Sequence, residues 1–135
     1  MVIPLTTLDN AQEAETPAPP LPPATTVDLA ELGELEVRHV QGPAGAPTVA
    51  LMHGWTASAD INYFTAYETL SQHFSVLAFD QRGHGTGLRT KKSFRLEDCA
   101  DDVIRVSDVL GIDELIGVGY SMGGTIAQLL WKQHP

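Results

Sequence analysis

Basic residues, cysteine and long apolar runs are all scarce in this sequence of 135 residues. Eight Lys and Arg residues stand against 17 Asp and Glu, and the formal net charge of −9 argues against a nucleic-acid partner. A single cysteine excludes an internal disulfide framework and is typical of a reducing compartment. No run approaches the roughly 18 apolar residues that span a bilayer, and the N-terminus lacks the early positive charge of a secretory signal. These absences predict a cytoplasmic protein with no membrane span.

Proline, by contrast, is concentrated near the N-terminus. Five prolines fall within seven positions: Pro17, Pro19, Pro20, Pro22 and Pro23. Because proline fixes φ and donates no backbone hydrogen bond, such a stretch favours extended, solvated chain over a packed element. We therefore expect residues 1–27 to form a disordered proline-rich arm and residues 28–135 to form the folded part.

Beyond the arm, short apolar runs alternate with amphipathic stretches. Residues 27–29 and 35–40 predict an opening antiparallel hairpin. Three uninterrupted apolar runs favour buried parallel strands, at 49–52, 76–79 and 115–118. Helices are expected at 57–73, irregularly, at 96–110 before Gly111, and at 122–133. The alternation predicts an α/β fold with a doubly wound, mostly parallel sheet, whose ligand site lies at the carboxyl ends of the strands.

The segment Gly119-Tyr120-Ser121-Met122-Gly123-Gly124 has the pattern of a nucleophile elbow. It directly follows one predicted strand and directly opens an amphipathic helix. A serine on so tight a turn adopts a strained backbone, and the crowding requires tiny residues two positions before and after it. Gly119 and Gly123 meet that requirement. The turn also aims the backbone N–H of Met122 to where an oxyanion would develop.

A second oxyanion donor is expected from His53-Gly54-Trp55, which follows the strand at 49–52. The backbone N–H of Trp55 is the candidate, and Gly54 allows the backbone to come close. We expect His53 to be a satisfied polar residue that shapes this loop. His84, within the turn 80–85, is weighed as a base and disfavoured, while Asp80 is expected to tie neighbouring backbone.

Five of the eight basic residues lie between Arg82 and Arg95. The ordinary interpretation of such a cluster is a solvated surface loop. The alternative that remains open is an anion-binding role.

Taken together, the loop 53–55, the turn 80–85 and the elbow 119–124 resemble the α/β-hydrolase fold family in their order and spacing. The resemblance covers residues 35–135. It implies Ser121 as the nucleophile and the N–H groups of Trp55 and Met122 as the oxyanion hole, with His53, Gly54, Gly119 and Gly123 as supporting residues. It implies a small-molecule ester or acyl substrate. We expect no metal or organic cofactor, because the sequence shows neither a cluster of metal ligands nor a phosphate-cradling loop. A serine at the elbow resembles the esterase, lipase, peroxidase-like and carbon–carbon bond hydrolase branches, whereas epoxide hydrolases and haloalkane dehalogenases of this fold use aspartate.

A neutral serine needs a base, and the family order is Ser, then Asp or Glu, then His. Only fourteen residues follow Ser121, none of them acidic, and the one downstream histidine is His134. Along a helix it would lie about 20 Å away, too far to act as the base. We therefore expect an N-terminal fragment, truncated after the elbow helix, that lacks the catalytic acid and base and has little turnover alone. The alternatives are a carbon–carbon bond hydrolase, an acyltransferase or a peroxidase-like member, or a non-catalytic binding module from a decayed hydrolase.

Overall fold

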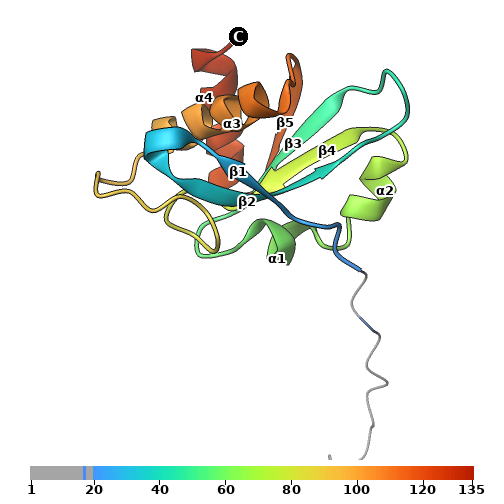
Figure 1. Cartoon of the computed structure of the whole chain (residues 1–135), viewed down its shortest axis with the longest axis horizontal. Coiled ribbons are helices and arrows are strands. Elements are labelled where there is room, and N and C mark those ends of the chain that lie inside the picture. Colours follow the sequence, from blue (N-terminus) through green and yellow to red (C-terminus); the bar gives the residue numbers. More distant parts are fainter. Residues whose placement is uncertain (1–16, 18–19) are drawn as a thin grey trace, which may run out of the picture.

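The computed structural model describes residue 17 and residues 20–135 of the chain (Figure 1). Its elements follow in the order β1 Thr25–Asp28, a 3-10 helix η1 Ala30–Leu32, β2 Glu34–Val40, β3 Thr48–Met52, α1 Ala59–Tyr63, α2 Tyr67–Ser71, β4 Ser75–Phe79, α3 Leu96–Leu110, β5 Leu115–Gly119 and α4 Met122–Gln133. The predicted strands at 49–52, 76–79 and 115–118 and the predicted helices at 96–110 and 122–133 are all confirmed. Among the described helices, none is long and apolar enough to cross a membrane.

The five described strands form one sheet in the order β1-β2-β4-β3-β5. The strands β4, β3 and β5 run parallel to one another. The opening hairpin β1–β2 is antiparallel and continues antiparallel onto β4. Because sequence neighbours β3 and β4 are joined through helices, the parallel part has the crossover connections that the alternating pattern predicts. The α/β fold class is confirmed.

Helices cover both faces of the central strands (Figure 1). The helices α3 and α4 pack on one face, where Ala50 and Leu77 join Val103 and Ile126 in a common core. The helices α1 and α2 pack on the other face, where Val49 and Val76 meet Tyr67. Successive strand residues point to opposite faces, so burial of both faces explains why these strands are apolar at every position.

The amphipathic helix α3 ends as its sequence predicts. Gly111 takes a left-handed conformation, with φ 68°, that ends the helix without the penalty a Cβ would bring. Cys99, on the inward stripe of α3, is fully buried, and burial raises the pKa of its thiol to about 12. A thiol so protected from ionisation behaves as a small apolar side chain.

Two boundaries differ from the sequence-based expectation. The single helix expected at 57–73 is wrong, since α1 and α2 are separate short helices. Each carries a tyrosine with a different partner: Tyr63 Oη donates to Met52 O in β3 at 2.8 Å, and Tyr67 Oη donates to Asp60 Oδ1 in α1 at 3.0 Å. The strand β1 begins at Thr25, three residues inside the expected arm, because it pairs with β2. Most of that arm, residues 1–16 and 18–19, lies outside the described residues.

The sheet is not covered equally at its two sides. Every residue of β3 and β4 is buried, whereas no residue of β5 is. The strand β5 pairs with β3 along one side and with no other strand in the described part of the chain. Its Ile116 and Val118 are 45% and 40% exposed. In the described part of the chain, β5 is therefore an exposed apolar edge of the sheet.

Candidate active site

Ser121 occupies the turn between β5 and α4 in a strained conformation, with φ 52° and ψ −117°. Non-glycine residues rarely take such angles, at a cost of about 1–3 kcal/mol, and they cluster at active sites. A Cβ at Gly119 would lie closer than 3.0 Å to Gly123 O, and a Cβ at Gly123 would lie equally close to Met52 O. Both glycines are therefore required by close backbone packing. The tight turn that the pattern predicts is present, and it leaves Ser121 exposed.

The carboxyl end of β3 holds the elbow in place. Tyr120 donates its backbone N–H to Met52 O at 3.1 Å, and Tyr63 Oη donates to the same carbonyl. Next along the chain, a Cβ at Gly54 would lie 3.4 Å from Ser121 Cβ. The loop 53–55 therefore lies directly against the elbow, as the order of the two motifs predicts.

The two backbone N–H groups expected to form an oxyanion hole have no partner within the described residues. The neighbouring Gly54 N–H is occupied, because it donates to Asn62 Oδ1 at 2.8 Å. That bond fixes the loop while leaving Trp55 N–H uncommitted. Met122 N–H belongs to the first turn of α4, where a helix has no internal acceptor for it. Sequence reasoning missed Asn62, since an asparagine within a short helix carries no signal of its partner.

His53 is fully buried, and both of its ring nitrogens are engaged. Its Nδ1 lies 2.7 Å from Gly54 O, and its Nε2 accepts the backbone N–H of Gln81 at 2.8 Å. This pairing places the proton on Nδ1 in a neutral ring. Burial lowers the pKa of His53, which keeps it neutral. The ring fastens the loop after β3 to the turn after β4, as the structural interpretation of His53 predicts.

Asp80, the first residue after β4, connects three segments. Its Oδ1 accepts the N–H of Ala59 at the start of α1 at 2.7 Å, and its Oδ2 accepts the N–H of Thr86 at 2.9 Å. A Cβ at Gly85 would overlap that carboxylate, which explains the glycine. The expectation that Asp80 ties neighbouring backbone is confirmed.

The rings of His84 and Phe94 lie beside the loop 53–55 and contact its own rings. The imidazole of His84 makes edge contacts with His53 and with Trp55, at centroid separations of 5.1 and 5.2 Å. The Trp55 indole also meets Phe94, at 5.3 Å. Trp55 is 58% exposed, so its ring forms a wall open to solvent. No hydrogen bond joins His84 to Ser121 in the described part of the chain.

Residues 47–135 match the alpha/beta hydrolase fold family. The chain belongs to this family. It is 36% identical over 83 residues to the bifunctional esterase/perhydrolase DCH of Acinetobacter calcoaceticus, a match covering 62% of this chain and 30% of that protein. It is 33% identical over 101 residues to the dihydrolipoyllysine-residue acetyltransferase component of the acetoin cleaving system of Cupriavidus necator, covering 75% of this chain and 27% of that protein.

Solved structures also superpose on the chain. A membrane phospholipase A matches with a TM-score of 0.75 and 29% identity, covering 84% of this chain and 36% of that one. The structure of E-2-(acetamidomethylene)succinate hydrolase matches with a TM-score of 0.73 and 26% identity, covering 84% and 40%. The chain spans about a third of the length of the curated relatives it matches.

No histidine in the described part of the chain is hydrogen bonded to Ser121. His134 follows the last residue of α4, so along the helix it lies about 20 Å from Ser121 at 1.5 Å per residue. Its Nε2 lies 2.8 Å from Asp101 Oδ1, on α3. This histidine–carboxylate pair lies at the C-terminal end of α4, whereas Ser121 lies at its N-terminal end, as the sequence spacing predicts.

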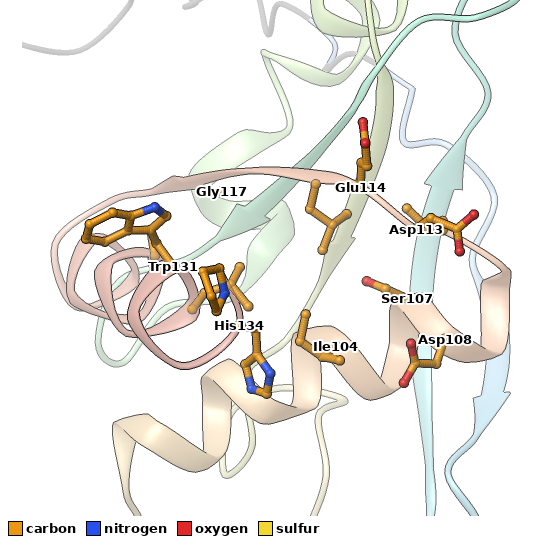
Figure 2. A pocket seen from close by; sticks show the side chains of 13 residues that line it. Ile104, Ser107, Asp108, Asp113, Glu114, Gly117, Trp131 and His134 are labelled. Atoms are coloured by element: carbon orange, nitrogen blue, oxygen red, sulfur yellow. The ribbon is translucent and has the colours of Figure 1, made fainter.

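A cavity of about 790 Å³ opens beside His134 rather than beside Ser121. Figure 2 shows Trp131 and His134 on one side of it and Ile104, Ser107 and Asp108 from α3 on the other. Its remaining wall comes from β5 and the loop before it, including Asp113, Glu114 and Gly117. It contains none of the residues expected to carry chemistry. The cavity therefore lies along the unpaired edge of β5 in the described part of the chain.

Proposed function

We propose that this chain supplies the nucleophile and the oxyanion hole of a serine hydrolase that acts on an ester or related acyl substrate. The observation that carries the proposal is the strained, exposed Ser121, held against the loop whose Trp55 N–H is uncommitted. A backbone cost of about 1–3 kcal/mol at a solvent-exposed serine is expected where the strain serves catalysis. The N–H of Met122, at the start of α4, is the second donor.

In the proposed reaction, Ser121 Oγ attacks the acyl carbon as its proton passes to a general base. The electron pair of the C=O bond moves to oxygen, and Trp55 N–H and Met122 N–H hold the resulting oxyanion. Collapse of this adduct expels the leaving group, which takes the proton, and leaves an ester on Ser121. Water then attacks the acyl carbon of that ester and gives its proton to the base. Collapse of this second adduct expels Ser121 Oγ, which takes the proton back, and releases the acid.

In this proposal the general base is a group other than His53 and His134. Both nitrogens of His53 are engaged, and His134 lies at the far end of α4. The relatives named above are about three times as long as the matched segment, which leaves ample chain for a histidine and its carboxylate. We accordingly expect the 135 residues alone to show little turnover.

Acyl transfer is a second candidate that one comparison favours. A relative bears the name of an acetyltransferase component, and the esterase relative is also called a perhydrolase. Both reactions share the acyl-enzyme on Ser121 and differ only in whether water, peroxide or another nucleophile removes the acyl group. Measuring the products formed from one ester with and without added alcohol or hydrogen peroxide separates them. Carbon–carbon bond cleavage remains the alternative if esters are inert.

Labelling with a fluorophosphonate tests the proposal, because the reagent reacts with activated serines. The protein as its natural cells produce it is treated with the probe. Its intact mass is then measured, and the labelled residue is identified by peptide sequencing. We expect one adduct, on Ser121, that is lost in Ser121→Ala and kept in Ser71→Ala, a variant of a serine at the end of α2. Absence of label on a product that is fully folded by circular dichroism would refute the enzyme and favour the non-catalytic binding module.

A further inference from the structure

A second cavity, of about 390 Å³, lies where η1, the loop after β4 and the helix α3 come together. Five of the chain's eight basic residues line it: Arg82, Arg89, Lys91, Lys92 and Arg105. Such a concentration is unexpected in a chain with a formal net charge of −9. Neither Ser121 nor the oxyanion donors belong to it, so the proposed hydrolase chemistry does not explain these charges.

The floor of this cavity is a fixed ion-pair network. Arg82 is 6% exposed, and its Nε and Nη2 each donate to Asp102 at 2.7 Å. Its Nη1 reaches Asp98 at 3.1 Å, while Arg105 Nη1 donates to Asp102 at 2.9 Å. Pairing with Asp102 raises the pKa of Arg82, which keeps the guanidinium charged. These residues form a rigid base for the cavity.

Arg89 holds the loop that forms one wall of the cavity, and its positive charge is not paired with a carboxylate. Its guanidinium donates to three backbone carbonyls of one turn, those of His84, Gly85 and Gly87, at 2.5–3.1 Å. Carbonyl oxygens satisfy the donors but carry no net charge. The contacts therefore hold the loop in shape while the positive charge of Arg89 remains without a carboxylate partner.

Lys91 and Lys92 supply the charge that is free to move. Both are exposed, and neither makes a hydrogen bond or ion pair within the described residues. The carboxylates at the cavity are Glu31 and Asp98 in its lining, together with Asp101 and Asp102, which both pair with Arg105. Five cations against four carboxylates leave a local excess of one positive charge. Concave walls focus that excess on whatever enters.

We propose that this cavity binds a small soluble ligand that bears a phosphate group. Its volume of about 390 Å³ falls in the range of small-molecule sites. The two lysines without a carboxylate partner favour an anion, and lysine ammonium groups bind phosphate as point charges on flexible stems beside the fixed arginines. A phospholipid surface fits less well, since the acidic chain as a whole is repelled by an anionic bilayer.

Titration calorimetry with pyrophosphate, in a phosphate-free buffer of low ionic strength, tests this site on the full chain. The test variant is Lys91→Gln/Lys92→Gln, and the matched control is Arg95→Gln/Lys132→Gln. The control removes the same two charges from exposed positions outside the cavity. We expect saturable binding that the test variant weakens by about tenfold or more and the control by less than about twofold.

Two results would overturn the proposal. One is a heat signal that does not saturate, or that falls equally in both variants, because either outcome reflects net charge rather than a site. The other is sedimentation of the chain with phosphatidylcholine vesicles containing phosphatidic acid in the absence of any pyrophosphate binding, which would assign the lysines to a lipid headgroup. Unchanged melting temperatures in both variants confirm that the comparison is made between folded proteins.

Discussion

The neighbouring strands β3 and β5 have the same kind of sequence but different surroundings. They are hydrogen bonded in parallel register, with Val49 opposite Ile116 and Leu51 opposite Val118. In β3, Val49 is 4% exposed and Leu51 is 2% exposed. In β5, Ile116 and Val118 are 45% and 40% exposed. An uninterrupted apolar run therefore predicts a strand built for burial, but it does not say how many neighbours that strand has.

The difference in burial extends to the segments that follow β3 and β5. After β3, His53 and Gly54 are held by hydrogen bonds on every side. Beyond β5, the far end of α4 carries Trp131, which is 76% exposed beside the acidic cavity of about 790 Å³. Ser121 lies between β5 and α4, and its turn is held by contacts with Met52 at the end of the buried strand β3. The geometry of the candidate site is therefore fixed by β3 and not by the exposed strand β5.

The anchor between β3 and the elbow gives the largest expected effect. In Gly123→Ala, the new Cβ would collide with Met52 O, and relief of that overlap requires a backbone shift. We expect the free energy of unfolding to fall by about 3 kcal/mol. The adjacent Gly124→Ala is the control, because its Cβ would lie 3.6 Å from Gly119 O. There we expect a gain of about 0.5–1 kcal/mol from helix propensity.

Urea unfolding of the two glycine variants measures both values. If Gly123→Ala and Gly124→Ala destabilise the protein equally, packing of α4 in general, and not contact with the end of β3, explains the need for glycine at position 123. A stable Gly123→Ala protein would show that the elbow is not fixed by β3.

Matched valine truncations measure the difference between the two strands directly. Val49→Ala removes two methyl groups from a buried site, and we expect a loss of about 2 kcal/mol. Val118→Ala removes the same groups from a site that is 40% exposed, and we expect a loss of about 1 kcal/mol or less. The intrinsic strand preference of valine is common to both, so it cancels. Equal losses by urea unfolding would contradict the exposure of β5.

Much of this arrangement follows from local sequence. The ends of β3, β4 and β5 coincide with the ends of apolar runs, since both faces of a central strand need the same kind of side chain. Gly111 ends α3, and the Gly119–Gly123 spacing marks the tight turn, because in each case only glycine fits the backbone.

What sequence reasoning missed depends on contacts between distant segments. The division of 57–73 into two helices follows from tyrosines that anchor to different partners. The bond from Gly54 to Asn62 and the pairing of Arg82 with Asp102 likewise depend on the folded sheet. None of these residues has a periodicity that names its partner. The roles of Ser121, Trp55 and Met122 remain predictions, since geometry alone places groups without showing a reaction.

The histidines His53, after β3, and His39, in β2, allow the stability of the sheet to be tested through pH. Burial lowers the pKa of His53, so its neutral form is favoured in the folded chain, whereas the unfolded ring takes a proton near pH 6.5. The contribution of neutral His53 to the free energy of unfolding is fully present above that pH. It is lost as the pH falls from about 6.5 through the folded pKa, and the free energy of unfolding then changes by up to about 1.4 kcal/mol per pH unit. His39 contributes in the same direction, because burial also lowers its pKa.

Unfolding in urea between pH 5 and 7 measures this slope. We expect His53→Gln to flatten it and His39→Gln to remove only part of it. Asp60, whose pKa is lowered by its hydrogen bond from Arg38, acts nearer pH 4 and does not confuse the result. An unchanged slope in His53→Gln would show that the ring is protonated in the folded chain, contrary to its two hydrogen bonds.

The smallest effect on stability is expected on the open strand itself. Lysines at Ile116 and Val118 place charge on side chains that are nearly half exposed, so the free energy of unfolding should change by less than about 1 kcal/mol. The same charges oppose pairing of β5 with a strand of another molecule, which is how natural sheet edges avoid aggregation. We therefore expect Ile116→Lys/Val118→Lys to scatter less light at high concentration than Asp108→Lys/Asp113→Lys, which adds lysines outside the strand. Equal scattering would mean that β5 is already protected, and the contrast with β3 would then be one of burial alone.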